Sequence, residues 1–338
     1  MNDVEKLLTE SLRNSADGEV DGMVLLERAT TRGRKFRRRH RAWMGAGLAV
    51  VAAVAAGGVI GGTHLWPVSG NGNGNGFDVA VGGQPGARPA TALPEVAGEQ
   101  GASVNPARVG ADVNLIHFDA TAITSTARHY TWTSGKGYEQ LAAGVGTEDL
   151  IYAEIGPDMG VLDGVERQND LGVVVREQPV PGLWLRVQAT DEKLARQIVG
   201  AIELDRVQRI VLPFQLTGLP AGASVVRSAV GFDDGVYTDG GVVLERDGNK
   251  RMEIQAQYAP GQGNDSARAN HVAGGRQAFL YPGQDEIELL GLRNLELSAR
   301  IGKAYQGFTV ADADLALGGV NVAADVTAMS TWPKTLTS

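Results

Sequence analysis

An uncharged stretch at residues 42–65, AWMGAGLAVVAAVAAGGVIGGTHL, dominates the hydrophobic pattern of the chain. A helix rises about 1.5 Å per residue, so this stretch is long enough to cross a hydrocarbon core of about 30 Å. It lacks the polar stripe that a soluble core helix of this length normally carries. The pattern predicts one transmembrane helix over 42–66, whose anchor residues are Trp43, Leu48, Val51, Val54, Ile60 and Trp66.

A basic run precedes this stretch and sets the predicted orientation. Its seven cationic residues are Arg32, Arg34, Lys35, Arg37, Arg38, Arg39 and Arg41. The next basic residue beyond the stretch is Arg88. The positive-inside rule therefore predicts a single-pass plasma-membrane protein with a cytoplasmic N-terminus and an extracytoplasmic C-terminal region. A cleaved secretory signal is the alternative, but its basic start usually lies at the very N-terminus.

Small residues near the outer end of the stretch form two overlapping small-xxx-small pairs. They are Gly57, Gly58, Gly61 and Gly62. Such pairs let two membrane helices approach closely, which makes them a candidate homodimer contact. An Ala/Gly-rich span also produces such pairs by chance.

The N-terminal arm, residues 1–41, contains two short amphipathic segments. The first places Leu7, Leu8 and Leu12 on one helical face. An isolated helix this short is marginal in water, so it needs a partner. The pattern predicts either a basic tail on anionic lipids of the bilayer or a docking helix for a cytoplasmic protein.

Beyond Trp66 the pattern predicts a linker followed by folded modules. Residues 67–111 are rich in Gly, Asn and Pro and offer little to bury, which indicates a flexible tether. From Asp112 onward, alternating apolar residues predict strands interspersed with helices. LWLRVQATDEKLARQIVGAIEL and LELSARIGKAYQGFTVADADLALGGVNV share one order of strand, Thr, acidic first helical turn and apolar stripe. We therefore predict an α+β fold with two β-rich modules, 112–205 and 206–334.

Several local elements of these modules follow from their residues. Val242–Arg246 and Arg251–Tyr258 alternate around Asp247-Gly248-Asn249, which predicts a hairpin. Helices are predicted after the caps Thr190 and Thr309. Residues 138–143 predict the opening of another short helix.

Charge excludes one class of function. The chain has a net charge of −8, and because residues 1–42 are basic, the region beyond them has 21 basic and 32 acidic residues. Nucleic-acid binding needs a basic footprint, so no nucleic-acid partner is expected. The chain has no cysteine, which excludes disulfides and cysteine-based zinc sites.

Motifs of catalysis are not found. The histidines His40, His64, His117, His129 and His271 lack metal-ligand spacing, and neither GxSxG nor SxxK occurs. His117 and His129 belong to one module, either as a metal pair or as ordinary satisfied side chains. FDDGVYTDGG contains three aspartates that suit either Ca²⁺ or ordinary turns. We predict no catalytic, cofactor or metal site.

A short arm with an LL-x3-L helix, the RGRKFRRRHR run, one Ala/Gly/Val span, a Gly/Pro tether and a β-rich region together resemble a known layout. It is similar to uncharacterised single-pass membrane proteins of high-GC Gram-positive bacteria, some of which are anti-sigma-like regulators. We predict a non-enzymatic protein whose extracytoplasmic modules bind a ligand, an envelope component or a protein partner. The alternatives are an anti-sigma-like regulator whose arm binds a transcription factor, and a tethered cell-envelope enzyme.

Overall fold

The computed structural model describes residues 93–99, 101, 104–145, 149–157, 164–167, 172–248, 250–261, 266–301 and 307–338. The chain divides into two units, 1–66 and 67–338, and all the described residues belong to the second. The predicted crossing, the basic run, the glycine pairs and the Leu7, Leu8 and Leu12 helix lie outside the described residues.

The first half of the described chain runs through eight strands and two α-helices. They are β1 (Leu115–Ile116), α3 (Thr121–Thr124), β2 (His129–Gly135), β3 (Tyr138–Val145), β4 (Asp149–Gly156), β5 (Gly164–Arg167), β6 (Val173–Val180), β7 (Leu183–Ala189), α4 (Glu192–Ala201) and β8 (Gln208–Arg209).

The second half adds nine strands and one α-helix. They are β9 (Phe214–Leu216), β10 (Ser224–Asp233), β11 (Val236–Arg246), β12 (Lys250–Tyr258), β13 (His271–Ala273), β14 (Arg276–Leu280), β15 (Glu286–Leu289), β16 (Leu295–Arg300), α5 (Val310–Gly318) and β17 (Val320–Val322). Short 3-10 turns lie at Pro106–Arg108, Ser266–Arg268 and Met329–Thr331.

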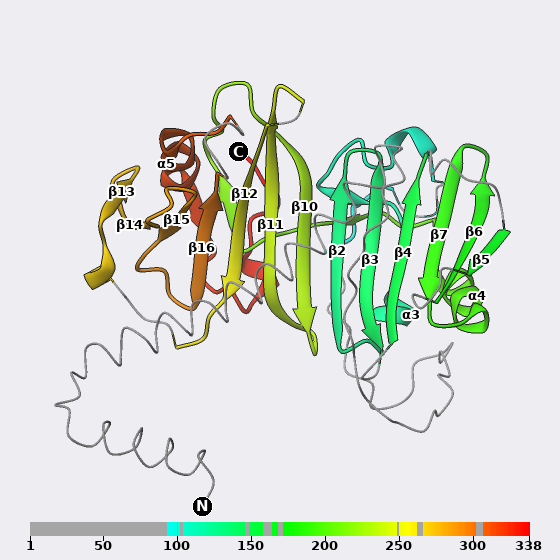
Figure 1. Ribbon diagram of the computed structural model, residues 1–338. Coiled ribbons are helices and arrows are strands. Elements are labelled where there is room, and N and C mark those ends of the chain that lie inside the picture. The colour runs from blue at the N-terminus through cyan, green and yellow to red at the C-terminus, as the bar shows by residue number, and fades with distance from the viewer. Residues whose placement is uncertain are drawn as a thin grey trace, which may run out of the picture. The chain divides into compact units, whose positions relative to one another are not determined.

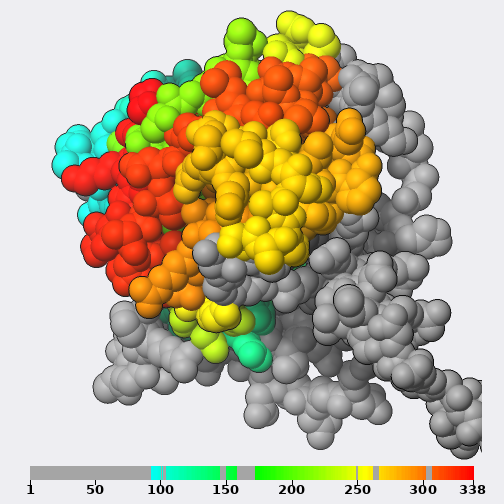
Figure 2. All heavy atoms as spheres, turned by 90° about the vertical axis from the view of Figure 1, so that its left-hand side faces the viewer, coloured from blue at the N-terminus to red at the C-terminus, as the bar shows by residue number. Residues whose placement is uncertain are grey.

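Thirteen of the strands form one antiparallel sheet (Figure 1). Its order is β13-β14-β15-β16-β12-β11-β10-β2-β3-β4-β7-β6-β5. Strand β2 pairs with β10 from His129↔Asp233 to Gly135↔Arg227, so strands from both halves share continuous backbone hydrogen bonding. Figure 2 looks onto the edge of this sheet at β13 and β14, where residues in yellow and orange lie at the surface.

Both halves follow the same strand order. In each, three strands form a meander (β2-β3-β4 and β10-β11-β12). The last strand that each half contributes to the large sheet then pairs with the third strand of the meander (β7 with β4, β16 with β12). A helix follows that last strand, and a short strand after the helix pairs with one that precedes the meander (β8 with β1, β17 with β9). The halves join antiparallel through their first meander strands, β2 and β10.

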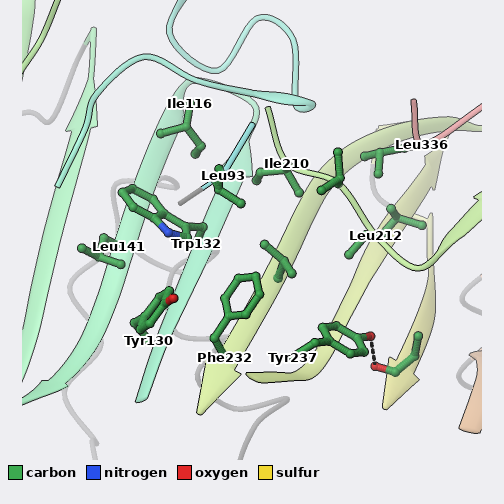
Figure 3. Close-up of a cluster of buried hydrophobic side chains, with 14 of the residues drawn as sticks. Leu93, Ile116, Tyr130, Trp132, Leu141, Ile210, Leu212, Phe232, Tyr237 and Leu336 are labelled. Carbon is green, nitrogen blue, oxygen red and sulfur yellow. Dashed lines mark hydrogen bonds between the residues drawn. The ribbon is translucent and has the colours of Figure 1, made fainter. Parts of the chain in front are cut away.

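One face of the sheet carries the hydrophobic core. A row of apolar residues runs through paired positions on eleven strands: Val175, Val187, Ala153, Leu141, Trp132, Val230, Gly240, Ala256, Leu297, Leu289 and Ala278. Segments outside the sheet cover this row with Leu93, Ile116, Ile210, Leu212 and Leu336, each at most 2% exposed (Figure 3). Since strand side chains alternate between faces, the neighbouring positions point to the other side.

The predicted fold class is corrected by this architecture. The described chain is mostly β-sheet, and its α-helices α3, α4 and α5 are at most ten residues long. Within the residues described, no helix is long and apolar enough to cross a membrane. The structure therefore contradicts an α+β fold with a transmembrane helix, and the predicted single-pass plasma-membrane location has no support in it.

Local predictions had mixed outcomes. The hairpin is confirmed as β11 and β12, with Asp247 and Gly248 at φ 55° and 76° in its turn. Thr309 is confirmed as the cap of α5, where it forms a capping box with Asp312. Helix α4 is instead capped by Asp191, which accepts a hydrogen bond from Leu194 N. Residues 138–143 are strand β3, because pairing with β2 and β4 outweighs their local preference.

Candidate functional site

The face of the sheet opposite the core is lined by polar residues, and we call it the polar face. One row of paired positions crosses eleven strands: Arg176, Arg186, Glu154, Gln140, Thr133, Ala229, Gly241, Gln255, Ser298, Glu288 and Phe279. Each position lies one residue from the apolar row. Eight of these eleven residues are polar, so the sheet has a packed face and a face with many hydrogen-bonding groups.

Charged groups on the polar face are paired with one another. Arg186 Nη1 lies 3.7 Å from Glu154 Oε2, on neighbouring strands β7 and β4. Toward the other end, Arg268 Nη2 donates to Glu288 Oε1 at 2.9 Å. Tyr281 Oη donates to the second oxygen of that carboxylate at 2.7 Å. Because the charges are compensated in pairs, much of the remaining hydrogen-bonding capacity comes from neutral amides and hydroxyls.

Titratable groups on this face are desolvated. Burial raises the pKa of the Glu154 carboxyl above its ordinary value, although Arg186 opposes the shift. Burial also raises the pKa of Asp239, and a hydrogen bond from Thr238 opposes it. The pKa of the Tyr152 hydroxyl is raised by burial as well. Several groups shifted in the same direction on one face are typical of a binding surface, and also occur in structural ion-pair networks.

A second polar cluster lies inside the core, beneath residues 109–118, which we call the strap. His117 Nδ1 lies 2.6 Å from Glu139 Oε1, and the same oxygen accepts a hydrogen bond from Gly110 N at 3.1 Å. The other carboxylate oxygen accepts from His117 N. Ser228 Oγ donates to Val113 O, and Gly137 N donates to Gly110 O at 3.2 Å. The cluster fastens the strap to β2, β3 and β10.

The composition of this cluster resembles a hydrolytic triad, but its burial does not suit one. Ser134 pairs with Glu139 across β2 and β3, and within the described chain neither Ser134 Oγ nor His117 Nε2 has a hydrogen-bond partner. Ser134 and Glu139 are 0% exposed and His117 is 3% exposed. A nucleophile needs access to its substrate, so we assign His117 and Glu139 to holding the strap.

The other candidates from the sequence have ordinary roles. His117 and His129 have different partners, since His129 Nδ1 lies 3.1 Å from Asp233 Oδ1. Asp234 and Gly235, at φ 51° and 75°, form the turn between β10 and β11, as expected for Asp-Gly in a tight hairpin. No group of three or more His, Asp or Glu side chains suited to a metal ion occurs among the residues that the structure describes.

Sequence reasoning did not identify the residues of the polar face or the partner of His117. The alternation in β4, β7 and β12 signals the polar positions, but strand order alone places them in one row. Glu139 was not among the candidate residues predicted from the sequence, because its segment was predicted to be a helix. The structure gives no support for the bilayer or homodimer contacts, whose residues lie outside the described part of the chain.

No family model matches the chain, and no curated protein matches it. Among solved structures, a match is found in the crystal structure of MucB in complex with MucA(peri). The match has 10% sequence identity and a TM-score of 0.21, and it covers 57% of this chain and 69% of that chain. At this level the likeness carries no argument about fold or function.

Proposed function

We propose that the described region is a non-catalytic binding module and that the polar face of its sheet is the binding surface. One observation carries the proposal: a row of paired positions crosses eleven strands on the side opposite the packed core, and eight of its eleven residues are polar. A sheet face needs only enough polarity to be solvated, whereas this one also carries desolvated carboxyls and interstrand ion pairs.

The proposal favours binding by side chains. The backbone groups of interior strands such as β3, β4, β11 and β12 are paired on both sides. Recognition on this face must therefore use side-chain amides, hydroxyls and charged pairs. The regulator alternative depends on residues 1–41 and remains a sequence prediction that the described residues do not address.

The chain has no cysteine, so single-cysteine variants can be labelled at chosen positions. We would attach an environment-sensitive fluorophore at Gln188→Cys on β7 and, in another variant, at Gln257→Cys on β12. The matched control is Asn321→Cys, an exposed position on β17 outside the large sheet. Probes would be neutral oligosaccharides, a random-sequence decapeptide mixture and phosphatidylglycerol vesicles.

A saturable change at Gln188→Cys or Gln257→Cys, with none at Asn321→Cys, is the expected result for at least one probe. If the fluorescence of both polar-face labels stays unchanged with every probe, the binding proposal is overturned. An equal response from the control label would show that binding occurs elsewhere.

A further inference from the structure

One part of the polar face differs in chemistry from the rest. Strands β2, β3, β4 and β7 bring together three aromatic side chains, two neutral hydrogen-bonding groups and one ion pair. We call this set the aromatic patch. Its members are Tyr138, Tyr152, Trp184, Thr133, Gln140, Glu154 and Arg186.

The aromatic residues occupy defined positions along neighbouring strands. Trp184 on β7 pairs with Gly156 on β4, and Tyr138 on β3 pairs with Gly135 on β2. A Cβ added at Gly135 would come within 2.5 Å of Tyr138 Cε1 and 2.6 Å of Cζ. The tyrosine ring therefore lies directly on the backbone of Gly135. Trp184 likewise pairs with a glycine, Gly156, on its neighbouring strand.

The polar members of the aromatic patch add groups that both donate and accept. The Gln140 amide and the Thr133 hydroxyl can each do so, and they occupy paired positions on β3 and β2. The Glu154 and Arg186 side chains, 3.7 Å apart, cancel each other's charge while still offering acceptors and donors. Burial raises the pKa of the Tyr138 and Tyr152 hydroxyls above its ordinary value.

These properties correspond to the chemistry of a sugar. A pyranose ring has hydroxyls around its edge that donate and accept, and apolar C–H groups on its faces that pack against aromatic rings. A nucleic acid would need a net positive surface. A peptide adding as a strand would need an unpaired strand edge, but β3, β4 and β7 each have neighbours on both sides.

We propose that the aromatic patch binds a neutral, hydroxyl-rich glycan. This inference rests on the proposed binding function of the polar face and names the class of ligand. Trp184 and Tyr138 supply the apolar contacts, while Gln140 and the Glu154–Arg186 pair supply directional hydrogen bonds.

The test is isothermal titration of the full chain with cellotetraose, maltotetraose and chitotetraose. Binding of at least one is expected. Trp184→Ala should weaken it at least about tenfold, which corresponds to about 1.4 kcal/mol. Val272→Ala is the matched control, because Val272 is 61% exposed and lies on edge strand β13. Its affinity should equal that of the parent.

A second variant guards against misfolding of Trp184→Ala. Gln140→Leu keeps the approximate size of the side chain and removes its hydrogen bonds, so it should also weaken binding while the thermal transition stays cooperative. Failure of all three sugars to bind, or full affinity in a folded Trp184→Ala variant, would overturn the glycan proposal. If the labels on the polar face respond to the decapeptides but not to sugars, the binding function stands and the glycan inference falls.

Discussion

His117 Nδ1 lies 2.6 Å from Glu139 Oε1, and both side chains are buried. The contact joins two segments 22 residues apart in the chain, the strap and strand β3. Glu139 also accepts hydrogen bonds from the backbone N–H groups of Gly110 and His117. One carboxylate thus fixes the segment that covers the first half of the core at the join between β2 and β10.

Removing the charge of Glu139 should loosen the strap. Glu139→Gln keeps one acceptor oxygen but replaces the other with a donor, which faces N–H groups. Disruption of a buried, hydrogen-bonded pair costs about 3 kcal/mol. Urea unfolding followed by tryptophan fluorescence would measure the loss, because Trp132 lies in the adjoining core. Glu99→Gln, which breaks an exposed pair with Arg108, should change stability little, and an equal effect would contradict the assignment.

Gly110 should tolerate no side chain. Its φ is 64°, and an added Cβ would lie 2.4 Å from Gly135 O and Gly137 N. Gly98 has φ 84° and nothing within 4 Å of that position. Gly98→Ala should therefore lower the free energy of unfolding only by the backbone strain, about 1 kcal/mol. Gly110→Ala adds a steric clash and should be clearly less stable, with faster hydrogen exchange at residues 110–118. Equal losses in the two variants would show that the close packing of Gly110 is unimportant.

Asp239 should make folding more favourable in acid. Burial raises its pKa in the folded protein, so the folded state binds this proton more tightly than the unfolded chain. The contribution of the protonated carboxyl to the free energy of unfolding is fully present below the pKa of the unfolded chain, about 3.9. It is lost as the pH rises through the pKa of the folded protein. Asp239→Asn should therefore raise Tm at pH 7 and approach the parent near pH 4.

Asp247 provides the control of opposite sign. Its pKa is lowered by a hydrogen bond and charge from Lys250, so its contribution is present above the unfolded pKa and lost on acidification. Asp247→Asn should not raise Tm at pH 7. Thermal melts of both variants from pH 4 to pH 7 decide the matter, and a lower Tm for Asp239→Asn at pH 7 would refute the prediction.

Leu336 should be essential to the second half of the core. It is 2% exposed, and Leu216 N on β9 donates to its carbonyl oxygen at 2.9 Å. Leu336→Ala should cost about 2–5 kcal/mol through lost burial and the cavity left behind. Lys334→Ala, at an exposed position nearby, should be nearly neutral in the same chemical unfolding measurement. A neutral result for Leu336→Ala would show that the C-terminal segment packs only loosely.

The sequence by itself determined the elements whose signals are local. The Asp247-Gly248 turn needs residues that adopt positive φ, and Thr309 meets the hydrogen-bonding needs of a helix start, so both were found from a few adjacent residues. Alternation within β12 and β7 likewise marked those segments as strands. The predicted α+β class with a transmembrane helix was wrong, because the described chain is mostly β-sheet and its α-helices are at most ten residues long.

Only the tertiary structure decided which strands are neighbours and which polar residues meet. Gln140, Glu154 and Arg186 share a row because β3, β4 and β7 pair in one register, although β5 and β6 lie between β4 and β7 in the chain. Glu139 became a core residue when β3 pairing turned it toward His117. Pairing between distant segments depends on the combined burial and hydrogen bonding of the whole sheet, and no short stretch of residues specifies it.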